Sequence, residues 1–244
     1  MAIETFNRFE HKYLVPDDVM EKMLAVMDEH MVMDKYCVNH STYTIANLYY
    51  DTEDDILIRR SLEKPVYKEK LRMRAYGVPK KSDIVFLEIK KKFAHSVNKR
   101  RTKIGLEEAY RFCESGEQPP PHDYMNHQVC NELEYFINRY GVKPKVYIAY
   151  DRLAYFEENN HDLRISFDKN IRTRRTDLRL ELGDYGTNIL PDGVWLMEIK
   201  TTQAKPLWLC RIISSLSLKR ISFSKYGTEF KHRTACRDTV LSYT

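Results

Sequence analysis

The charged residues of this chain follow the period of a β-strand, and this pattern constrains the fold more than any other feature. The segment KLRMRAYG, residues 70–77, places basic residues at every second position and apolar residues between them. Because successive side chains of a strand point to opposite faces, Arg72 and Arg74 share one face and Met73 lies on the other. A sheet with one ionic face and one apolar face is therefore predicted. The same alternation recurs in residues 6–15, 83–92, 162–168 and 194–202.

Two further strand-like segments and three helices complete the expected elements. Residues 44–51 and 145–156 are rich in aromatic and β-branched residues, as strands are. Apolar residues at helical spacing predict helices over residues 16–31, 126–140 and 206–218. These helices would cover the apolar face of the sheet, which leaves the ionic face for solvent or for the inside of a barrel.

A proline-rich loop at residues 114–124 separates two halves of similar order. Each half runs through an aromatic-Asp strand, an arginine-bearing strand and a Glu-Ile-Lys strand. Neither half has enough strands to bury a sheet alone, so we expect one α+β domain over residues 1–244. The ionic face would line the inside of a closed antiparallel β-barrel, with the helices packed on its outside.

Cysteine usage and the apolar segments indicate a cytoplasmic protein without a membrane span. The five cysteines are widely spaced and include no Cys-x-x-Cys pair, which disfavours a zinc site or a disulfide framework and favours a reducing compartment. The first residues contain no apolar signal-peptide core, and no segment approaches the roughly 18 apolar residues of a membrane span.

Basic residues outnumber acidic residues on the ionic face. A solvated sheet face is the simpler explanation, and it would suffice for a single strand. In a confined lumen, however, such a surplus is costly without a compensating anion, and arginine forks match phosphate oxygens. A chain of phosphates is therefore the favoured ligand, and the few carboxylates suit Mg²⁺ or Mn²⁺. The bases are Arg8, Lys12, Arg72, Arg74, Lys90, Arg152, Arg164 and Lys200, and the acids are Glu10, Glu88 and Glu198.

An ordered set of motifs resembles the triphosphate tunnel metalloenzyme superfamily. Within it, the chain is similar to the polyphosphate polymerase domain of the vacuolar transporter chaperone complexes and its free-standing bacterial relatives. The resemblance covers roughly residues 6–230 and implies a closed, eight-stranded antiparallel tunnel that transfers the terminal phosphoryl group of ATP to polyphosphate with a divalent metal. It is carried by the motifs RFEHKYLV, KLRMRAYG, VFLEIKKK, NKRRTKI, AYDRLAY, DLRISFD, LMEIK and FSKYGTEF.

The resemblance implies a role for individual residues. Glu198 would hold the metal, with Glu10 and Glu88 as further carboxylate ligands. Residues 99–101 would lie near a tunnel mouth. Phosphates would be held by Lys12, Arg72, Arg74, Lys90, Arg152, Arg164, Lys200 and Lys225, and further substrate contacts would come from Arg8, Lys92, Lys99, Arg100, Arg101, Ser224 and Tyr226.

One departure from the superfamily pattern bears on the reaction. The superfamily opens with Glu-x-Glu-x-Lys, whereas Arg8 stands here at the position of the first Glu. That change argues against a simple triphosphate hydrolase and favours a metal-dependent polyphosphate polymerase that uses ATP. A triphosphatase and a non-catalytic polyphosphate-binding module stay open as alternatives. A membrane-protein partner would serve export, and the absence of a recognised module argues against nucleic acid as a partner.

Overall fold

The computed structural model describes residues 9–94, 96–158 and 162–241, with side chains as far as residue 235. Arg8, a predicted substrate contact, lies outside the described residues. The strands are β1 (Phe9–Pro16), β2 (Val32–Met33), β3 (Tyr43–Asp51), β4 (Tyr67–Tyr76), β5 (Ile84–Phe93), β6 (Ser96–Gly105), β7 (Lys143–Phe156), β8 (Arg164–Arg174), β9 (Thr187–Asn188), β10 (Val194–Thr201) and β11 (Arg220–Ile221). The α-helices are α1 (Asp17–His30), α2 (Ile56–Leu62), α3 (Leu106–Ser115), α4 (His127–Tyr140), α5 (Leu207–Ser215) and α6 (Lys225–Leu241).

All the described strands belong to one 11-stranded antiparallel sheet, and its order is β11-β1-β10-β8-β7-β3-β4-β5-β6. Two short strands lie off this path, because β2 pairs with β7 and β9 pairs with β8. The antiparallel sheet and the outer helices were predicted correctly, whereas the closed barrel of eight strands was wrong. Among the described residues, β6 and β11 end the order without pairing to each other.

Side chains approach each other between the two ends of the sheet. Lys90 on β5 lies 4.0 Å from Glu10 on β1, so side chains rather than backbone hydrogen bonds span this gap. Burial lowers the pKa of Lys90, attraction to Glu10 opposes that shift, and repulsion from Lys200 adds to it.

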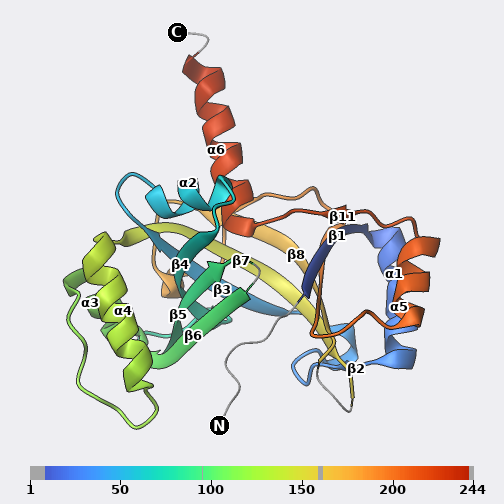
Figure 1. Cartoon of the computed structure of the whole chain (residues 1–244), viewed down its shortest axis with the longest axis horizontal. Coiled ribbons are helices and arrows are strands. Elements are labelled where there is room, and N and C mark those ends of the chain that lie inside the picture. The colour runs from blue at the N-terminus through green and yellow to red at the C-terminus, as the bar shows by residue number, and fades with distance from the viewer. Residues whose placement is uncertain (1–8, 95, 159–161, 242–244) are drawn as a thin grey trace.

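Three hydrophobic clusters hold the helices on the sheet, and Figure 1 shows where these helices lie. The helices α3 and α4 cover the outward face of β3, β4 and β5, where Leu71 and Met73 are fully buried. The helices α1 and α5 cover β1, β8 and β10, where Met197 and Ile199 lie in the core. The predicted apolar face is therefore confirmed at both ends of the sheet, under α3 and α4 and under α1 and α5.

The third cluster was not predicted, because it lies on the concave face, which the sequence indicated to be ionic. Ile45, Ile148 and Leu196 on the concave side pack with Tyr226 and Phe230 of α6. The first turns of α6, together with α2, therefore close over part of the concave face, and the rest of α6 extends away from the sheet (Figure 1). The ionic surface is limited to what these two helices leave uncovered.

The predicted helices begin and end close to the expected residues. Asn126 caps α4 by accepting a hydrogen bond from the Val129 amide at 3.1 Å, and Gly141 ends the helix in a left-handed conformation. The helix predicted over residues 16–31 is α1, and the one predicted over residues 206–218 is the shorter α5. No helix in the described part of the chain is long and apolar enough to cross a membrane.

Candidate functional site

The basic side chains predicted for the ionic face converge on the concave side of the sheet. Side-chain contacts between β-strands and distant parts of the chain establish this convergence. Arg74 on β4 donates to the Tyr150 hydroxyl on β7 at 3.1 Å, and Lys70 on β4 donates to the Ser224 hydroxyl at 3.3 Å. Lys12 on β1 donates to the Phe223 carbonyl at 2.9 Å. Side chains from both halves of the chain therefore meet on the concave side of the sheet, and we call this side, with the side chains on it, the hollow.

Asp168 on β8 holds two of the predicted cations. Arg152 Nε and Nη2 donate to its two carboxylate oxygens at 2.7 and 2.9 Å, and Lys225 Nζ donates at 2.6 Å. Burial alone would raise the pKa of this carboxyl, but Arg152 and Lys225 lower it to about 2. Asp168 was missed as a site residue, although it shares strand parity with Arg164 and could have been found in that way.

Tyr150 lies within this group of cations and was also missed. Lys225 Nζ lies 4.2 Å from the centroid of its ring, and Arg152 Cζ lies 5.2 Å from it. Burial would raise the pKa of the Tyr150 hydroxyl, but Arg74, Arg152 and Lys225 together lower it to about 7. The Tyr150 hydroxyl can therefore carry negative charge near pH 7, as the Asp168 carboxylate does in the same part of the hollow. Nothing in the sequence pattern distinguishes Tyr150 from a tyrosine that only packs in the core.

Glu88 on β5 also lies between two cations. Arg72 Nε and Lys99 Nζ each approach it at 2.7 Å, and its side chain is 1% exposed. Burial disfavours the charged carboxylate, but Arg72, Arg74 and Lys99 hold the pKa of Glu88 below its usual range. Arg72 also donates to the Tyr49 hydroxyl at 3.2 Å, which fixes the guanidinium on the concave face.

A third acidic group joins β1 and β10. Lys12 Nζ lies 2.9 Å from a Glu10 oxygen and 3.2 Å from a Glu198 oxygen, and Glu198 also pairs with Lys200. Burial would raise the pKa of Glu198, but Lys200 and Lys12 hold it well below its usual value, so this carboxylate is ionised at neutral pH.

The same two carboxylates would hold a divalent cation. Glu10 and Glu198 both contact Lys12, so their oxygens converge on one position of the concave face. No cluster of three His, Cys, Asp or Glu side chains suited to a metal exists among the residues that the structure describes. This set fits an ion of the Mg²⁺ type, which typically takes one or two carboxylates and completes its coordination with water and phosphate oxygens. Glu88 is separate from this pair, because it contacts Arg72 and Lys99 and not the Lys12 that Glu10 and Glu198 share.

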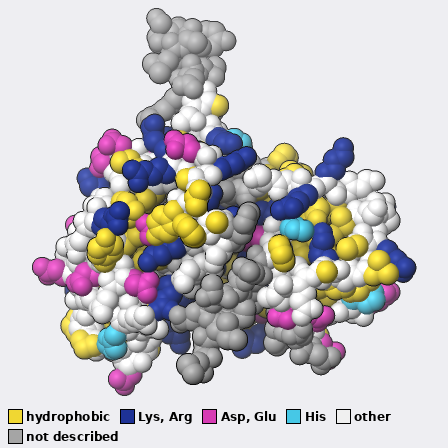
Figure 2. Space-filling model, viewed as in Figure 1, with side chains coloured by type: hydrophobic (Ala, Val, Ile, Leu, Met, Phe, Trp, Pro, Cys, Tyr) yellow, Lys and Arg dark blue, Asp and Glu magenta, His cyan; other side chains and the backbone are white. Residues whose placement is uncertain are grey.

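Lysines dominate the end of the hollow formed by the start of β4 and the end of β5. Lys68 pairs with Lys92 across the two strands, and Lys70 pairs with Lys90. Lys64, just before β4, adds to the repulsion on Lys68. Figure 2 shows Lys and Arg side chains gathered around α2 and the base of α6, the helices that flank this end. We call Lys64, Lys68, Lys70, Lys90 and Lys92 the lysine end.

The charge of the lysine end is poorly neutralised. Among the described residues, no ion pair joins Lys64, Lys68, Lys70 or Lys92 to a carboxylate, and Lys90 has only the 4.0 Å contact with Glu10. Burial, followed by repulsion from Lys90 and Lys68, lowers the pKa of Lys70 to about 7. Amines that repel one another in this way favour an anion with several negative charges.

The lowered pKa of Lys70 predicts proton uptake on anion binding. Above pH 7 most Lys70 amines are neutral in the free protein, and an adjacent phosphate favours the charged form. At pH 8.5 we expect tripolyphosphate binding to take up as much as about one proton, with affinity falling as pH rises above about 7. Calorimetry in buffers of different ionisation enthalpy measures this uptake.

Three variants assign the proton. Lys70→Arg keeps its charge at all working pH values, so uptake should fall and affinity at pH 8.5 should be retained. Tyr150→Phe and Lys99→Arg report the separate shares of two further groups, whose pKa values are lowered to about 7 and about 8. Uptake that is unchanged in Lys70→Arg would exclude Lys70 as the proton acceptor.

Several predicted residues lie apart from the hollow. Arg100 points to the opposite face of the sheet, where its Nε lies 3.2 Å from Glu132 of α4. The Tyr226 hydroxyl donates to Asp51 at 3.1 Å within the third cluster. Residues 99–101 were predicted to lie near a tunnel mouth, but they lie within β6, and strand alternation then separates Arg100 from its two neighbours.

Other predicted residues lie on the concave face itself. Arg101 lies over the Phe86 ring, with its Cζ 4.8 Å from the centroid. Arg164 lies over the Phe156 ring at 4.7 Å, opposite Lys200 on β10. Ser224 accepts from the Gly227 amide at 3.2 Å at the start of α6, besides its contact with Lys70.

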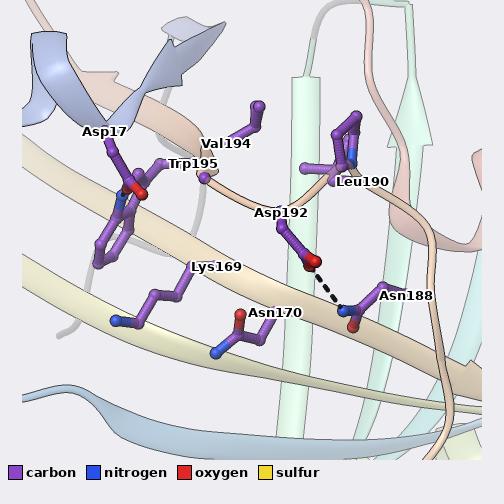
Figure 3. A pocket seen from close by; sticks show the side chains of 10 residues that line it. Asp17, Lys169, Asn170, Asn188, Leu190, Asp192, Val194 and Trp195 are labelled. Atoms are coloured by element: carbon purple, nitrogen blue, oxygen red, sulfur yellow. Dashed lines mark hydrogen bonds between the residues drawn. The ribbon is translucent and has the colours of Figure 1, made fainter.

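A small pocket of about 150 Å³ at the start of α1 contains none of the predicted residues. Figure 3 shows its polar side chains. The Trp195 indole donates to Asp17 at 2.6 Å, Asn188 donates to Asp192 at 3.4 Å, and Lys169 lies over the Trp195 ring. Because these groups satisfy one another, the concave face is the stronger candidate for a functional site.

Known proteins resemble this chain in sequence and in fold. The sequence profile of the VTC domain matches residues 7–232. Subunit 4 of the vacuolar transporter chaperone complex of Schizosaccharomyces pombe is 24% identical over 269 residues, which cover 91% of this chain and 37% of that subunit. The chain thus spans well under half the length of this curated relative.

Two solved structures share the fold. A proposed adenylate cyclase from Bacillus halodurans aligns with a TM-score of 0.55 at 13% identity, over 91% of this chain and 96% of that one. A proposed adenylyl cyclase from Hippeastrum, described as having a dominant triphosphatase activity, aligns with a TM-score of 0.52 at 14% identity, over 89% and 92%.

Proposed function

This chain belongs to the VTC domain family, and from that premise we propose that it is a metal-dependent polyphosphate polymerase. It would bind the triphosphate of ATP on the concave face and transfer the γ-phosphoryl group to a growing polyphosphate chain. The observation that carries this proposal is the lysine end, whose amines, apart from the 4.0 Å contact of Lys90 with Glu10, lack carboxylate partners among the described residues. A long polyanion would neutralise them in a way that a small monoanion would not.

Different side chains on the concave face would bind phosphate and metal in such a reaction. Arg72, Arg74 and Arg152 are fixed by contacts with Glu88, Asn47 and Asp168, so they can orient phosphates without reordering.

In phosphoryl transfer, positioning and charge neutralisation account for most of the catalysis, and both require such a fixed basic surface. Glu10 and Glu198 would hold the divalent cation, Mn²⁺ or Mg²⁺, which supplies further neutralisation of phosphate charge.

Two other functions remain as candidates. A triphosphatase would use the same hollow with water as acceptor, and the Hippeastrum protein of similar fold has that activity. A polyphosphate-binding module without catalysis would need only the cations. The ion pairs that occupy Glu88, Asp168 and Glu198 in this structure are compatible with that role.

The remaining parts of the proposal concern the surroundings of the protein. We place it in the cytoplasm, where the free thiols of Cys37, Cys113, Cys130 and Cys210 are stable. ATP and polyphosphate would be its ligands, a membrane protein would export the polymer, and nucleic acid is not an expected partner. The sheet would act as a single domain.

Incubation of the purified protein with ATP and Mn²⁺ or Mg²⁺ separates the three functions. Gel electrophoresis and ³¹P NMR would detect long polymer for a polymerase and inorganic phosphate for a triphosphatase. A protein that binds polyphosphate tightly and converts no ATP with either metal is the binding module. Failure to bind tripolyphosphate at all would contradict every one of these functions.

The Arg72→Ala variant should weaken tripolyphosphate binding by about 1.5–3 kcal/mol, the usual range for hydrogen bonds to charged groups. Titration calorimetry without metal measures this loss. Arg139→Ala is the matched control, because Arg139 is exposed on α4, where it contacts Tyr135 at 3.0 Å on the helix-covered side. Equal losses in the two variants would mean that net charge, and not the concave face, governs binding.

A further inference from the structure

Aromatic rings form a continuous line at the end of the hollow opposite the lysine end. The ring centroids of Tyr36 and Tyr43 lie 5.9 Å apart, those of Tyr43 and Tyr76 lie 6.2 Å apart, and those of Tyr76 and Phe86 lie 6.0 Å apart. Arg101 extends the line by lying over Phe86. We call Tyr36, Tyr43, Tyr76 and Phe86 the aromatic rim.

The aromatic rim continues the phosphate-facing rows of the same strands. Tyr76 follows Arg74 by two residues on β4, so both side chains lie on the concave face. Phe86 pairs with Arg74 across β4 and β5, and Tyr43 pairs with Arg152 across β3 and β7. Two residues along a strand span about 7 Å. A triphosphate held by Arg72 and Arg74 would therefore leave the rest of its nucleotide at Tyr76.

The exposure of these rings also favours a ligand. Tyr36 is 63% exposed and Tyr76 is 51% exposed, although both belong to a set of rings in mutual contact. Single exposed aromatic side chains are ordinary on protein surfaces and require no explanation. A contiguous set that ends on an arginine and adjoins a phosphate-binding surface offers flat faces for another ring.

We propose that the aromatic rim stacks the nucleobase of the nucleoside triphosphate, an inference that rests on the proposed function. The Tyr43 hydroxyl already donates to Asp34, so ring faces, rather than hydrogen bonds to base edges, dominate the rim. Stacking on ring faces accepts every base, because each base has a π-face. The site therefore tolerates all four common nucleoside triphosphates and favours purines, whose larger rings cover more of the rim.

The test compares a ligand that has a base with one that lacks it. Tyr76→Ala should weaken ATP binding about tenfold, within the range measured for loss of one base-stacking contact, and should change tripolyphosphate binding less than twofold. Titration calorimetry without metal measures both ligands, and retained tripolyphosphate binding shows that the variant is folded. Tyr76→Phe should bind ATP like the unmodified protein, because it keeps the ring.

Tyr67→Ala is the matched control, because Tyr67 is a 47% exposed tyrosine on the same strand with the parity of the apolar face. It should leave both affinities unchanged. An equal loss of ATP and tripolyphosphate binding in Tyr76→Ala, or no loss of either, would overturn the base-stacking role and leave the proposed function intact. Failure of the unmodified protein to bind either ligand would overturn the proposed function, and the base-stacking role with it.

Discussion

Replacement of Glu198 by Gln should lower turnover by orders of magnitude at saturating ATP while metal-free tripolyphosphate binding holds steady or tightens. The substitution keeps the shape of the side chain and removes its charge, and hard divalent cations need anionic oxygen ligands. Glu198 is ionised because Lys200 and Lys12 hold its pKa well below the usual value. Loss of that charge leaves the two lysines free for phosphate, which accounts for the tighter binding.

Two measurements on the same variant distinguish a metal ligand from a simple counter-ion. Calorimetry gives metal-free tripolyphosphate affinity, and the rate as a function of Mn²⁺ or Mg²⁺ concentration gives the metal requirement. Glu88→Gln is the comparison, because Glu88 also lies between two cations but not beside Glu10. It should change anion affinity and keep the metal dependence. Near-normal turnover in Glu198→Gln would refute the metal role, and turnover lost together with anion binding would indicate a displaced Lys200.

Replacement of Asp168 by Ala should lower the free energy of unfolding by about 3–5 kcal/mol, the usual cost of removing one partner of a buried ion pair. Asp168 is fully buried, and its loss leaves Arg152 and Lys225 without their shared carboxylate. Urea denaturation of the variant and the unmodified protein measures the difference. Added tripolyphosphate should raise the free energy of unfolding more for the variant than for the unmodified protein, because it binds the folded state and replaces the missing negative charge.

An exposed ion pair provides the control. Glu53 and Lys143 lie 2.7 Å apart with side chains that are 70% and 66% exposed, so Glu53→Ala should change stability far less than Asp168→Ala. If Asp168→Ala were as harmless as Glu53→Ala, then the Asp168 ion pairs would not stabilise the fold.

The pH dependence of stability should agree with the same assignment. The folded pKa of Asp168, about 2, is below its ordinary value, so its contribution is complete above about pH 4 and is lost as pH falls through about 2.

Strand alternation made much of the site predictable. Met73 and Arg72 are adjacent in sequence and lie on opposite faces as expected, because a strand permits no other arrangement. The same rule applied to residues 99–101 would have removed Arg100, but no strand was predicted over this segment. Asp168 could have been found by parity alone, whereas Tyr150 became recognisable only when strands distant in sequence brought Arg74 and Lys225 to it.

The sequence could not show whether the sheet closes into a barrel or stays open. Strands of two residues such as β2, β9 and β11 have no detectable period, and their pairing depends on tertiary contacts. The cover that α2 and α6 place over the concave face was missed for a related reason. Ile148 and Leu196 share parity with charged residues of the same strands, and only the packed helices distinguish the two parts of that face.

The paired arrangement of charges in the hollow has a consequence for how a polymer would move. Glu88, Asp168 and Glu198 each lie between two cations in the resting protein. In the proposed reaction, an arriving phosphate would share these cations with the carboxylates, which would again neutralise the cations alone when the phosphate leaves. Because the cations keep a carboxylate partner throughout, no single position would become a trap. A chain of identical units could then advance stepwise past these three points, with each step energetically similar to the last.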